Sequence, residues 1–231
     1  MPAQVKICGL TTPDAVRAAA RADYAGFVFY PPSPRNLSPQ QAAALANALP
    51  PAVRRVALVV DTDDASLAAL LRDFAADILQ LHGDETPARV ATIRERFGLP
   101  VMKAIAVREA GDVARASAYY AVADRLLFDA RPPERPGALP GGNAEPFDWR
   151  LLAGQTFPLP WMLSGGLTPE NVAAAIAISA APAVDVSSGV EVRPGLKDPA
   201  KIAAFISAVR GEISDMNQIL IKSTRVDREG A

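Results

Sequence analysis

Two apolar runs of the chain end in side chains that can carry a proton. VKIC ends in Cys8, the only cysteine, and RLLFD ends in Asp129. A thiol with an unperturbed pKa of about 8.5 needs little help to act as a base, whereas a carboxyl group must stay protonated to act as an acid. Taken singly, a strand cysteine is more often a small buried hydrophobe, and a strand-end aspartate is often a helix cap. The pair is informative only if the fold brings both groups together.

Two other runs lead into glycine-containing loops. LSGGLTPEN carries Gly165 and Gly166, and DVSSGVE carries Ser188 and Gly189. Backbone N–H groups of such loops can approach phosphate oxygens closely, and a helix that starts just after the loop adds a favourable dipole. A glycine pair can also be a tight turn and nothing more. Two such loops after consecutive strands favour a phosphate site.

The remaining candidates are single residues. His82, the only histidine, ends the run DILQLH, and Arg35 lies in PPSPRNLSP. A lone histidine is often a structural residue, and a loop arginine is often a solvated charge. One histidine and one cysteine without a close carboxylate cluster make a poor ligand set, so we expect no metal.

Composition narrows the class of partner. The 231 residues are 50% hydrophobic, with a formal net charge of -1 and a pI near 5.9. This length and hydrophobic content suffice for a sizeable core. The chain has no excess of basic residues that would indicate nucleic-acid binding, and no uninterrupted apolar run that could cross a membrane. One cysteine cannot form an intrachain disulfide, and the first residues contain no signal-peptide core. We therefore expect a cytoplasmic protein that binds a small molecule.

Strand-like and helix-like segments alternate along the chain. Eight runs rich in β-branched or aromatic residues are each followed by a stretch of helical period, which predicts a single (β/α)8 barrel, the TIM barrel, of class α/β. The predicted strands cover residues 5–8, 24–30, 55–60, 77–82, 101–107, 125–130, 161–165 and 183–188. The predicted helices cover residues 13–22, 39–48, 64–75, 87–97, 108–120, 147–153, 169–180 and 199–210.

A hydroxyl residue followed by proline recurs where helices should start. The hydroxyl can cap free N–H groups while proline takes the first helical position, and Gln41 completes a capping box with Ser38. The four pairs are Thr12-Pro13, Ser38-Pro39, Thr86-Pro87 and Thr168-Pro169.

Two segments break the alternation. Residues 131–146 are rich in proline and glycine and predict a long loop over the end of the sixth strand, either a lid or a plain solvated insertion. The barrel domain should cover residues 1–211, and residues 212–231 form a C-terminal tail whose order the sequence does not reveal.

A barrel of this kind places its active site at the carboxyl ends of the strands. Cys8, Asp129 and the glycine loops would then share one rim, with Cys8 and Asp129 on strands that lie well apart. Alternation puts Lys6 on the same face of the first strand as Cys8. If that face points inward, the Lys6 ammonium would favour the thiolate.

Several motifs together resemble a known family. KICGLTTPDA, AGFVFYPPSPRNLSPQQA, LQLHGDE, LLFDA, FDW, LSGGLTPENV and DVSSGVEVRPGLKD occur in this order over residues 4–210. The sequence is thereby identified as similar to the phosphoribosylanthranilate isomerases of tryptophan biosynthesis. The resemblance implies a cofactor-free Amadori rearrangement of N-(5-phosphoribosyl)anthranilate to 1-(2-carboxyphenylamino)-1-deoxyribulose 5-phosphate.

The resemblance also implies residue roles. Asp129 would be the general acid that opens the ribose ring, and Cys8 the general base that removes the proton from C2'. Arg35 would pair with the anthranilate carboxylate, which suits a guanidinium fork. The other matched positions are Gln80, His82 and Asp185 near the substrate and Gly165, Gly166, Ser188 and Gly189 at the phosphate. The departure from the family pattern is GGNAEPFDW, where members often have a GGTGKTFDW-like stretch.

Three alternatives stay open at this stage. A related phosphosugar enzyme, such as the Amadori isomerase of histidine biosynthesis, would share the barrel, but no internal repeat is visible here. A Schiff-base enzyme could use Lys6 or Lys103, both on predicted strands. A non-catalytic phospholigand-binding barrel would need neither Cys8 nor Asp129.

A monomer and a homodimer are both compatible with the sequence.

Overall fold

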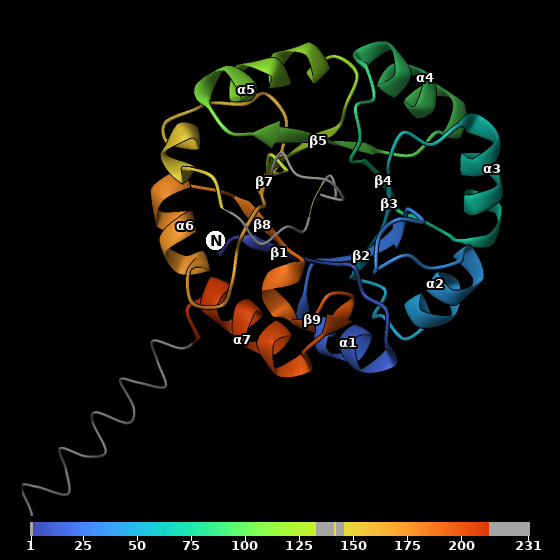
Figure 1. The fold of residues 1–231 in the computed structure, drawn as a ribbon, viewed down its shortest axis with the longest axis horizontal. Coiled ribbons are helices and arrows are strands. Elements are labelled where there is room, and N and C mark those ends of the chain that lie inside the picture. Colours follow the sequence, from blue (N-terminus) through green and yellow to red (C-terminus); the bar gives the residue numbers. More distant parts are fainter. Residues whose placement is uncertain (1, 133–140, 142–145, 213–231) are drawn as a thin grey trace, which may run out of the picture.

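The computed structural model describes residues 2–132, 141 and 146–212. Within these residues eight parallel strands hydrogen-bond in sequence order and close into a barrel, with β1 paired to both β2 and β8. Figure 1 looks down the barrel, with the strands at the centre and the helices in a ring around them. The predicted (β/α)8 fold is confirmed. The barrel strands are β1 (Gln4–Cys8), β2 (Tyr24–Phe29), β3 (Arg54–Val59), β4 (Ile78–Leu81), β5 (Val101–Val107), β6 (Arg125–Ala130), β7 (Trp161–Leu163) and β8 (Ala183–Val186).

The outer ring contains both α-helices and short 3-10 helices. In the described residues the α-helices are α1 (Pro13–Ala18), α2 (Pro39–Ala46), α3 (Asp64–Asp73), α4 (Pro87–Phe97), α5 (Ala110–Ala114), α6 (Val172–Ser179) and α7 (Pro199–Arg210). The 3-10 helices are η1 (Ala19–Arg21), η2 (Arg115–Tyr119), η3 (Trp149–Leu152) and η4 (Ser188–Val190).

Three of the predicted helix starts are confirmed by their caps. The hydroxyls of Thr12, Ser38 and Thr86 each accept a hydrogen bond from the backbone N–H three residues later. Gln41 Oε1 in turn accepts a hydrogen bond from the Ser38 backbone N–H at 2.9 Å, which completes the capping box. These caps satisfy N–H groups that a helix leaves free at its start.

The fourth predicted start is wrong. α6 begins at Val172 rather than Pro169, and residues 169–171 form a turn although Thr168 makes capping hydrogen bonds. Its backbone N–H donates to Asn171 Oδ1 at 2.8 Å, and its hydroxyl accepts from the Glu170 N–H. The glycine loop after β7 is therefore longer than predicted.

Three predicted helices are shorter than their sequence pattern, and the first of them, residues 13–22, divides into α1 and η1. The segment 147–153 forms only η3, a single 3-10 turn capped by Asp148, and the segment 108–120 divides into α5 and η2. A helical period over one or two turns does not select between α and 3-10 geometry, because tertiary packing decides so short a segment.

A two-stranded hairpin after β8 was not predicted. β9 (Glu191–Arg193) pairs antiparallel with β10 (Leu196–Lys197). Its turn contacts the loops after β1 and β2, since Thr11 Oγ1 donates to the Gly195 carbonyl at 2.8 Å and a Cβ at Gly195 would lie 2.5 Å from the Pro34 carbonyl oxygen. The hairpin thus closes one side of the rim.

The barrel interior is filled in layers that change from apolar to polar along the axis. The layer toward the amino ends of the strands consists of apolar side chains that include Tyr24, Ile78 and Leu127. Above it lies the Lys6–Asp185 pair, fully or almost fully buried, and the third layer contains Cys8. The prediction that Lys6 and Cys8 face inward is confirmed, and the pocket lies above this third layer.

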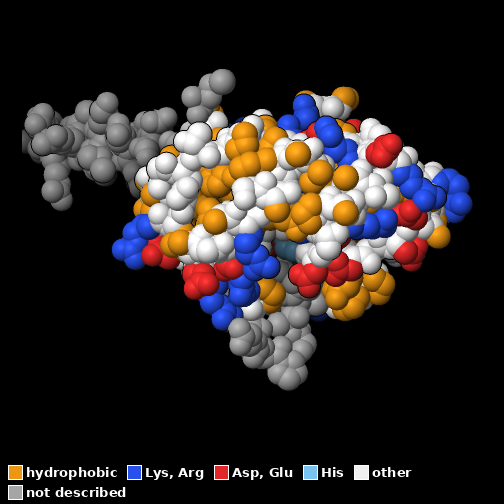
Figure 2. Space-filling model, turned by 90° about the horizontal axis from the view of Figure 1, so that it is seen from above, with side chains coloured by type: hydrophobic (Ala, Val, Ile, Leu, Met, Phe, Trp, Pro, Cys, Tyr) orange, Lys and Arg blue, Asp and Glu red, His pale blue; other side chains and the backbone are white. Residues whose placement is uncertain are grey.

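The outer surface carries mixed charge. On the face that Figure 2 shows, Lys and Arg side chains are interspersed with Asp and Glu, and neither sign covers it. None of the helices in the described residues has the length and hydropathy to span a membrane. α7 ends at Arg210, and most of the predicted tail and of the 131–146 loop lies outside the described residues.

Candidate active site

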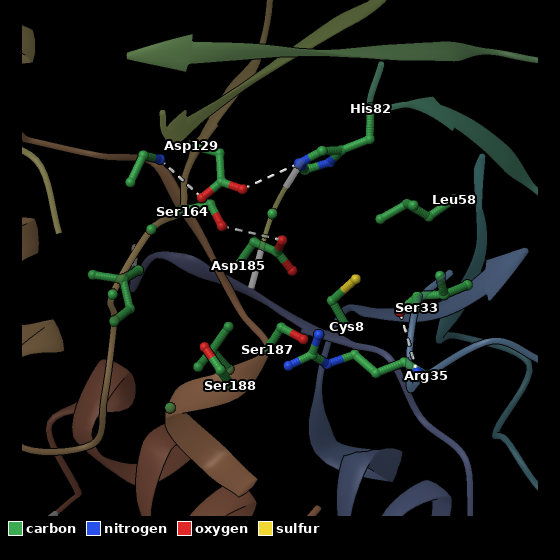
Figure 3. Close-up of a pocket in the computed structure, with 18 of the residues that line it drawn as sticks. Cys8, Ser33, Arg35, Leu58, His82, Asp129, Ser164, Asp185, Ser187 and Ser188 are labelled. Atoms are coloured by element: carbon green, nitrogen blue, oxygen red, sulfur yellow. Dashed lines mark hydrogen bonds and ion pairs between the residues drawn. The ribbon is translucent and has the colours of Figure 1, made fainter. Parts of the chain in front are cut away.

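One pocket opens at the carboxyl ends of the strands. It encloses about 780 Å³ including its mouth, and its lining contains almost all of the residues predicted for the site. Figure 3 shows Asp129 and His82 together on one side, with Cys8 and Arg35 on another. The predicted site residues in the lining are Cys8, Arg35, His82, Asp129, Gly165, Gly166, Asp185, Ser188 and Gly189. The strand ends therefore gather at one rim, as predicted.

Cys8 lies at the end of β1 against a glycine. Its register partner on β2 is Gly26, where a Cβ would lie 3.0 Å from the Cys8 sulfur and 3.2 Å from Lys6 Nζ. The thiol also packs with Val28 and Leu58 and is 4% exposed. Burial raises the pKa of Cys8 above its usual value, although the positive charges of Lys6 and Lys197 oppose that shift.

The Lys6 ammonium forms an ion pair with Asp185. Its Nζ lies 2.9 Å from Asp185 Oδ1, inside the barrel and below the thiol. Burial disfavours the charged amine, but the negative charges of Asp185 and of a Cys8 thiolate raise the pKa of Lys6 above its usual value. Lys6 stays protonated and lowers the cost of a thiolate. The predicted effect of Lys6 on the thiolate has the expected direction, but desolvation of Cys8 is the larger effect and raises the pKa of the thiol overall.

Asp129 is held by its own strand end and by His82. Its Oδ1 accepts from the Ala130 N–H at 2.9 Å, and its Oδ2 lies 3.1 Å from His82 Nε2. His82 Nδ1 in turn lies 2.8 Å from the Gln80 amide nitrogen. Gln80 Oε1 is buried and has no hydrogen-bond partner among the described residues. A Cβ at Gly141 would lie 2.6 Å from His82 Nε2, so only a glycine backbone passes this close to the pair.

Gln80 reaches the site indirectly. It is absent from the described lining of the pocket, and its amide contacts His82 instead. The family resemblance placed Gln80 near the substrate, and alternation along β4 puts its side chain on the same face as that of His82. The fold confirms the face and places Gln80 one layer deeper.

The two glycine loops follow β7 and β8 and meet where Gly189 lies against the Leu167 carbonyl. Gly165 and Gly166 have positive φ angles of 89° and 64°, and within the described part of the chain their N–H groups have no acceptor. Asn171 holds this loop by donating from its side chain to the Gly166 carbonyl at 2.9 Å. Because α6 begins at Val172, the predicted helix dipole does not directly follow the loop. The free backbone N–H groups of Gly165 and Gly166 remain available as hydrogen-bond donors to an anion.

Gly189 is required by the close approach of these loops. A Cβ there would lie 1.8 Å from the Leu167 carbonyl oxygen, so Gly189→Ala must push the loops apart. We expect KM for a phosphorylated substrate to rise roughly tenfold or more and stability to fall by about 1–3 kcal/mol. Steady-state kinetics and thermal unfolding test this, with Gly111→Ala, whose Cβ has no contact below 3.9 Å, as the control. A Gly189→Ala enzyme with normal KM and melting temperature would contradict the prediction.

Arg35 is fixed by residues that sequence reasoning missed. It is 5% exposed and forms a two-bonded ion pair with Glu191, from Nε at 2.8 Å and from Nη2 at 2.9 Å. Lys197 Nζ contacts the same carboxylate at 2.7 Å. The segment after β8, SSGVEVRPGLKD, contains four charged residues, and nothing in its sequence singles out Glu191 and Lys197.

The lysines considered for a Schiff base are both engaged. Lys103 Nζ contacts Glu85 at 3.0 Å and the Gly83 carbonyl at 2.7 Å, and Lys6 is paired with Asp185. Neither belongs to the described lining of the pocket. This geometry does not favour imine formation.

Comparisons with known proteins agree on one family. A family model described as N-(5'phosphoribosyl)anthranilate (PRA) isomerase matches residues 5–208. The N-(5'-phosphoribosyl)anthranilate isomerase of Paramagnetospirillum magneticum is 58% identical over 213 residues, covering 91% of this chain and 99% of the relative. That of Rhodospirillum rubrum is 55% identical over 213 residues, covering 89% and 97%.

Solved structures give the same result. Phosphoribosyl anthranilate isomerase from Thermotoga maritima superposes with a TM-score of 0.80 at 38% identity, covering 90% of this chain and 99% of that one. A second such isomerase, in complex with reduced 1-(o-carboxyphenylamino)-1-deoxyribulose 5-phosphate, has a TM-score of 0.76 at 36% identity, with coverage of 90% and 99%.

Proposed function

Because the chain belongs to the N-(5'-phosphoribosyl)anthranilate isomerase family of tryptophan biosynthesis, we propose that Asp129 is the general acid and Cys8 the general base of its reaction. The observation that carries the assignment is that both groups line one pocket from strands three places apart around the barrel. Groups placed so can act on different sides of one bound molecule.

The acid step uses the proton of Asp129. Its carboxyl group donates a proton to the ribose ring oxygen of N-(5'-phosphoribosyl)anthranilate, the C1'–O bond breaks, and the nitrogen lone pair forms an iminium. Asp129 is left as a carboxylate, which the Ala130 N–H stabilises at 2.9 Å.

The base step uses the thiolate of Cys8. The thiolate removes the proton from C2', and the C–H electrons form the enolamine while the iminium nitrogen becomes neutral. Tautomerisation of the enolamine gives the ketone, so the whole sequence is an isomerisation without a net redox change. Lys6, charged at neutral pH, supports the thiolate from below.

The Gln80–His82 pair can form a hydrogen bond with Asp129 both when its carboxyl group is ionised and when it is protonated. As the amide is oriented, Gln80 donates to His82 Nδ1, so Nε2 carries the proton and donates to the Asp129 carboxylate. A half-turn of the amide would give the unpartnered Gln80 Oε1 a donor, Nδ1–H, and leave Nε2 free to accept from protonated Asp129. Both protonation states of the acid therefore have a matching arrangement.

Substrate binding falls to the rest of the rim. Arg35 would pair with the anthranilate carboxylate, and the loops with Gly165, Gly166, Ser188 and Gly189 would bind the phosphate, while Asp185 would contact the substrate from the same pocket lining. The relative solved with a phosphorylated carboxyphenylamino ligand supports this class of ligand.

A monomer and a homodimer both remain compatible; a Thermotoga maritima relative is described as dimeric.

Complementation tests the reaction and substrate together. We expect this chain to restore growth without tryptophan to a bacterial host that lacks its own phosphoribosylanthranilate isomerase. The Cys8→Ala chain should fail, whereas Asp77→Asn, which breaks an Arg55 pair before β4, should succeed. Absence of growth with wild-type protein present in soluble form would contradict the proposed function.

A further inference from the structure

The guanidinium of Arg35 has one edge occupied and one edge free. Glu191 takes Nε and one N–H of Nη2, both at hydrogen-bond distance. A guanidinium has five N–H donors, so Nη1 and the second N–H of Nη2 form another parallel pair. Among the described residues Nη1 has no partner, and Arg35 lines the pocket. The Glu191 contact thus leaves one fork available to a ligand carboxylate.

An Arg–Glu pair alone would be a weak anion site, since its net charge is zero. Lys197 changes this balance, because its Nζ contacts Glu191 Oε1 at 2.7 Å, the oxygen that also accepts from Arg35 Nε. The three side chains are each at most 8% exposed and together carry a formal charge of +1. In so dry a setting one unit of charge has a large effect on a neighbouring carboxylate.

The cluster is held from several elements. Lys197 also donates to the Ser187 carbonyl at 3.0 Å, and Lys201 of α7 donates to the Glu191 carbonyl at 2.9 Å. On the β1 side, Gly9 makes room for the arginine, since a Cβ there would lie 2.6 Å from Arg35 Cδ. The arginine therefore has little freedom to turn.

We infer that Glu191 and Lys197 are positioning residues for Arg35, Glu191 by orienting its free edge into the pocket and Lys197 by keeping the cluster positive. The β9–β10 hairpin that carries both residues would then determine how strongly the enzyme prefers substrates with a carboxylate on the aromatic ring. This inference rests on the proposed function, in which Arg35 binds that carboxylate.

The test compares two ligands that differ only in the carboxylate. One is reduced 1-(o-carboxyphenylamino)-1-deoxyribulose 5-phosphate, and the other is its phenylamino counterpart, with Kd measured by calorimetry. We expect Glu191→Gln to weaken the carboxylated ligand about tenfold or more and to leave the other within about threefold. If Glu191 acted only through its charge, its removal would tighten binding of the carboxylated ligand, and that result would overturn the inference.

Variants of Lys197 provide a second, independent test of the inference. Lys197→Met should weaken only the carboxylated ligand, and Lys197→Arg should restore its affinity. Asp77→Asn, which removes the partner of another arginine at the opposite end of the barrel, should change neither ligand. Equal weakening of both ligands in Lys197→Met, with no rescue by arginine, would assign Lys197 a structural role only.

A pH profile provides a readout that loss of structure does not mimic. Burial lowers the pKa of Lys197 to about 8, against the opposing charge of Glu191, while Arg35 and Cys8 are the other charged or titratable groups that face it. Kd for the carboxylated ligand should therefore rise between pH 7 and 9 as the ammonium is lost. Measured on a Cys8→Ala background, which removes the thiol, the rise should persist with Lys197 and vanish with Lys197→Arg. A flat profile with Lys197 would overturn its part in the inference.

Arg35→Met separates failure of the inference from failure of the proposed function. It should abolish the preference for the carboxylated ligand. If it does so while Glu191→Gln and Lys197→Met leave the preference intact, the inference is wrong and the role of Arg35 stands. If Arg35→Met itself leaves the preference unchanged, the proposed carboxylate site is wrong.

Discussion

Changing Asp129 to asparagine is expected to lower kcat by about 10²–10⁴-fold, the usual loss for a general acid. The amide has nearly the same shape and can still accept from the Ala130 N–H, which now lies 2.9 Å from Oδ1. It cannot deliver a carboxyl proton to the ring oxygen. Its NH₂ group would face His82 Nε2, which the half-turn of Gln80 described above can accommodate, so we expect the fold to persist.

Steady-state kinetics with N-(5'-phosphoribosyl)anthranilate give the measurement. KM should change far less than kcat, since the carboxylate and phosphate contacts are elsewhere on the rim. Asp124→Asn is the matched control, because Asp124 directly precedes β6 at its other end and pairs with Arg94 at 2.7 Å. It should keep kcat within a few-fold. An Asp129→Asn enzyme with near-normal kcat would remove Asp129 from the acid role.

The second large effect is expected from Cys8. Cys8→Ala should reduce kcat by a similar factor of about 10²–10⁴, because it removes the proposed general base. Cys8→Ser should not restore activity, since a hydroxyl is much less acidic than a thiol. The stability cost should be near 1 kcal/mol or less, because only one atom is lost from its contact with Val28 and Leu58. Val28→Ala, which alters the same cluster without removing a base, should keep most of the turnover.

The pH dependence of kcat distinguishes a base from a packing residue. Burial raises the pKa of Cys8, so in the resting enzyme the protonated thiol predominates at neutral pH and the thiolate increases as pH rises. We expect kcat to increase with pH from neutral into the alkaline range. In Cys8→Ala this increase should disappear from the residual activity. A variant that retained the same rise would show that another group titrates.

Much of the fold was accessible from the sequence because its signals are local. Unbroken apolar strands, helical periods between them and hydroxyl–proline caps are properties of a few adjacent residues, and they predicted the barrel and the starts of α1, α2 and α4. The failures were local as well. Thr168 had the same cap signature and makes capping hydrogen bonds, yet residues 169–171 form a turn and α6 begins at Val172.

The sequence predicted which residues line the site, but not which of their side chains contact one another. Strand ends placed Cys8, His82 and Asp129 at one rim because every parallel strand of a closed barrel ends on the same side. Nothing in the sequence joined Arg35 to Glu191, 156 positions away, or Lys6 to Asp185, 179 positions away. Such contacts exist only after the barrel closes and β8 lies beside β1.

The sequence by itself therefore determined the barrel, its family and the side chains that meet at one rim, because periodicity, turn chemistry and motif order are written along the chain. The tertiary structure alone decided the environment of those side chains. Burial raises the pKa of Cys8 despite Lys6, Gln80 acts behind His82, and a hairpin holds Arg35. Desolvation and ion pairing depend on neighbours from distant elements, and those neighbours are set by packing.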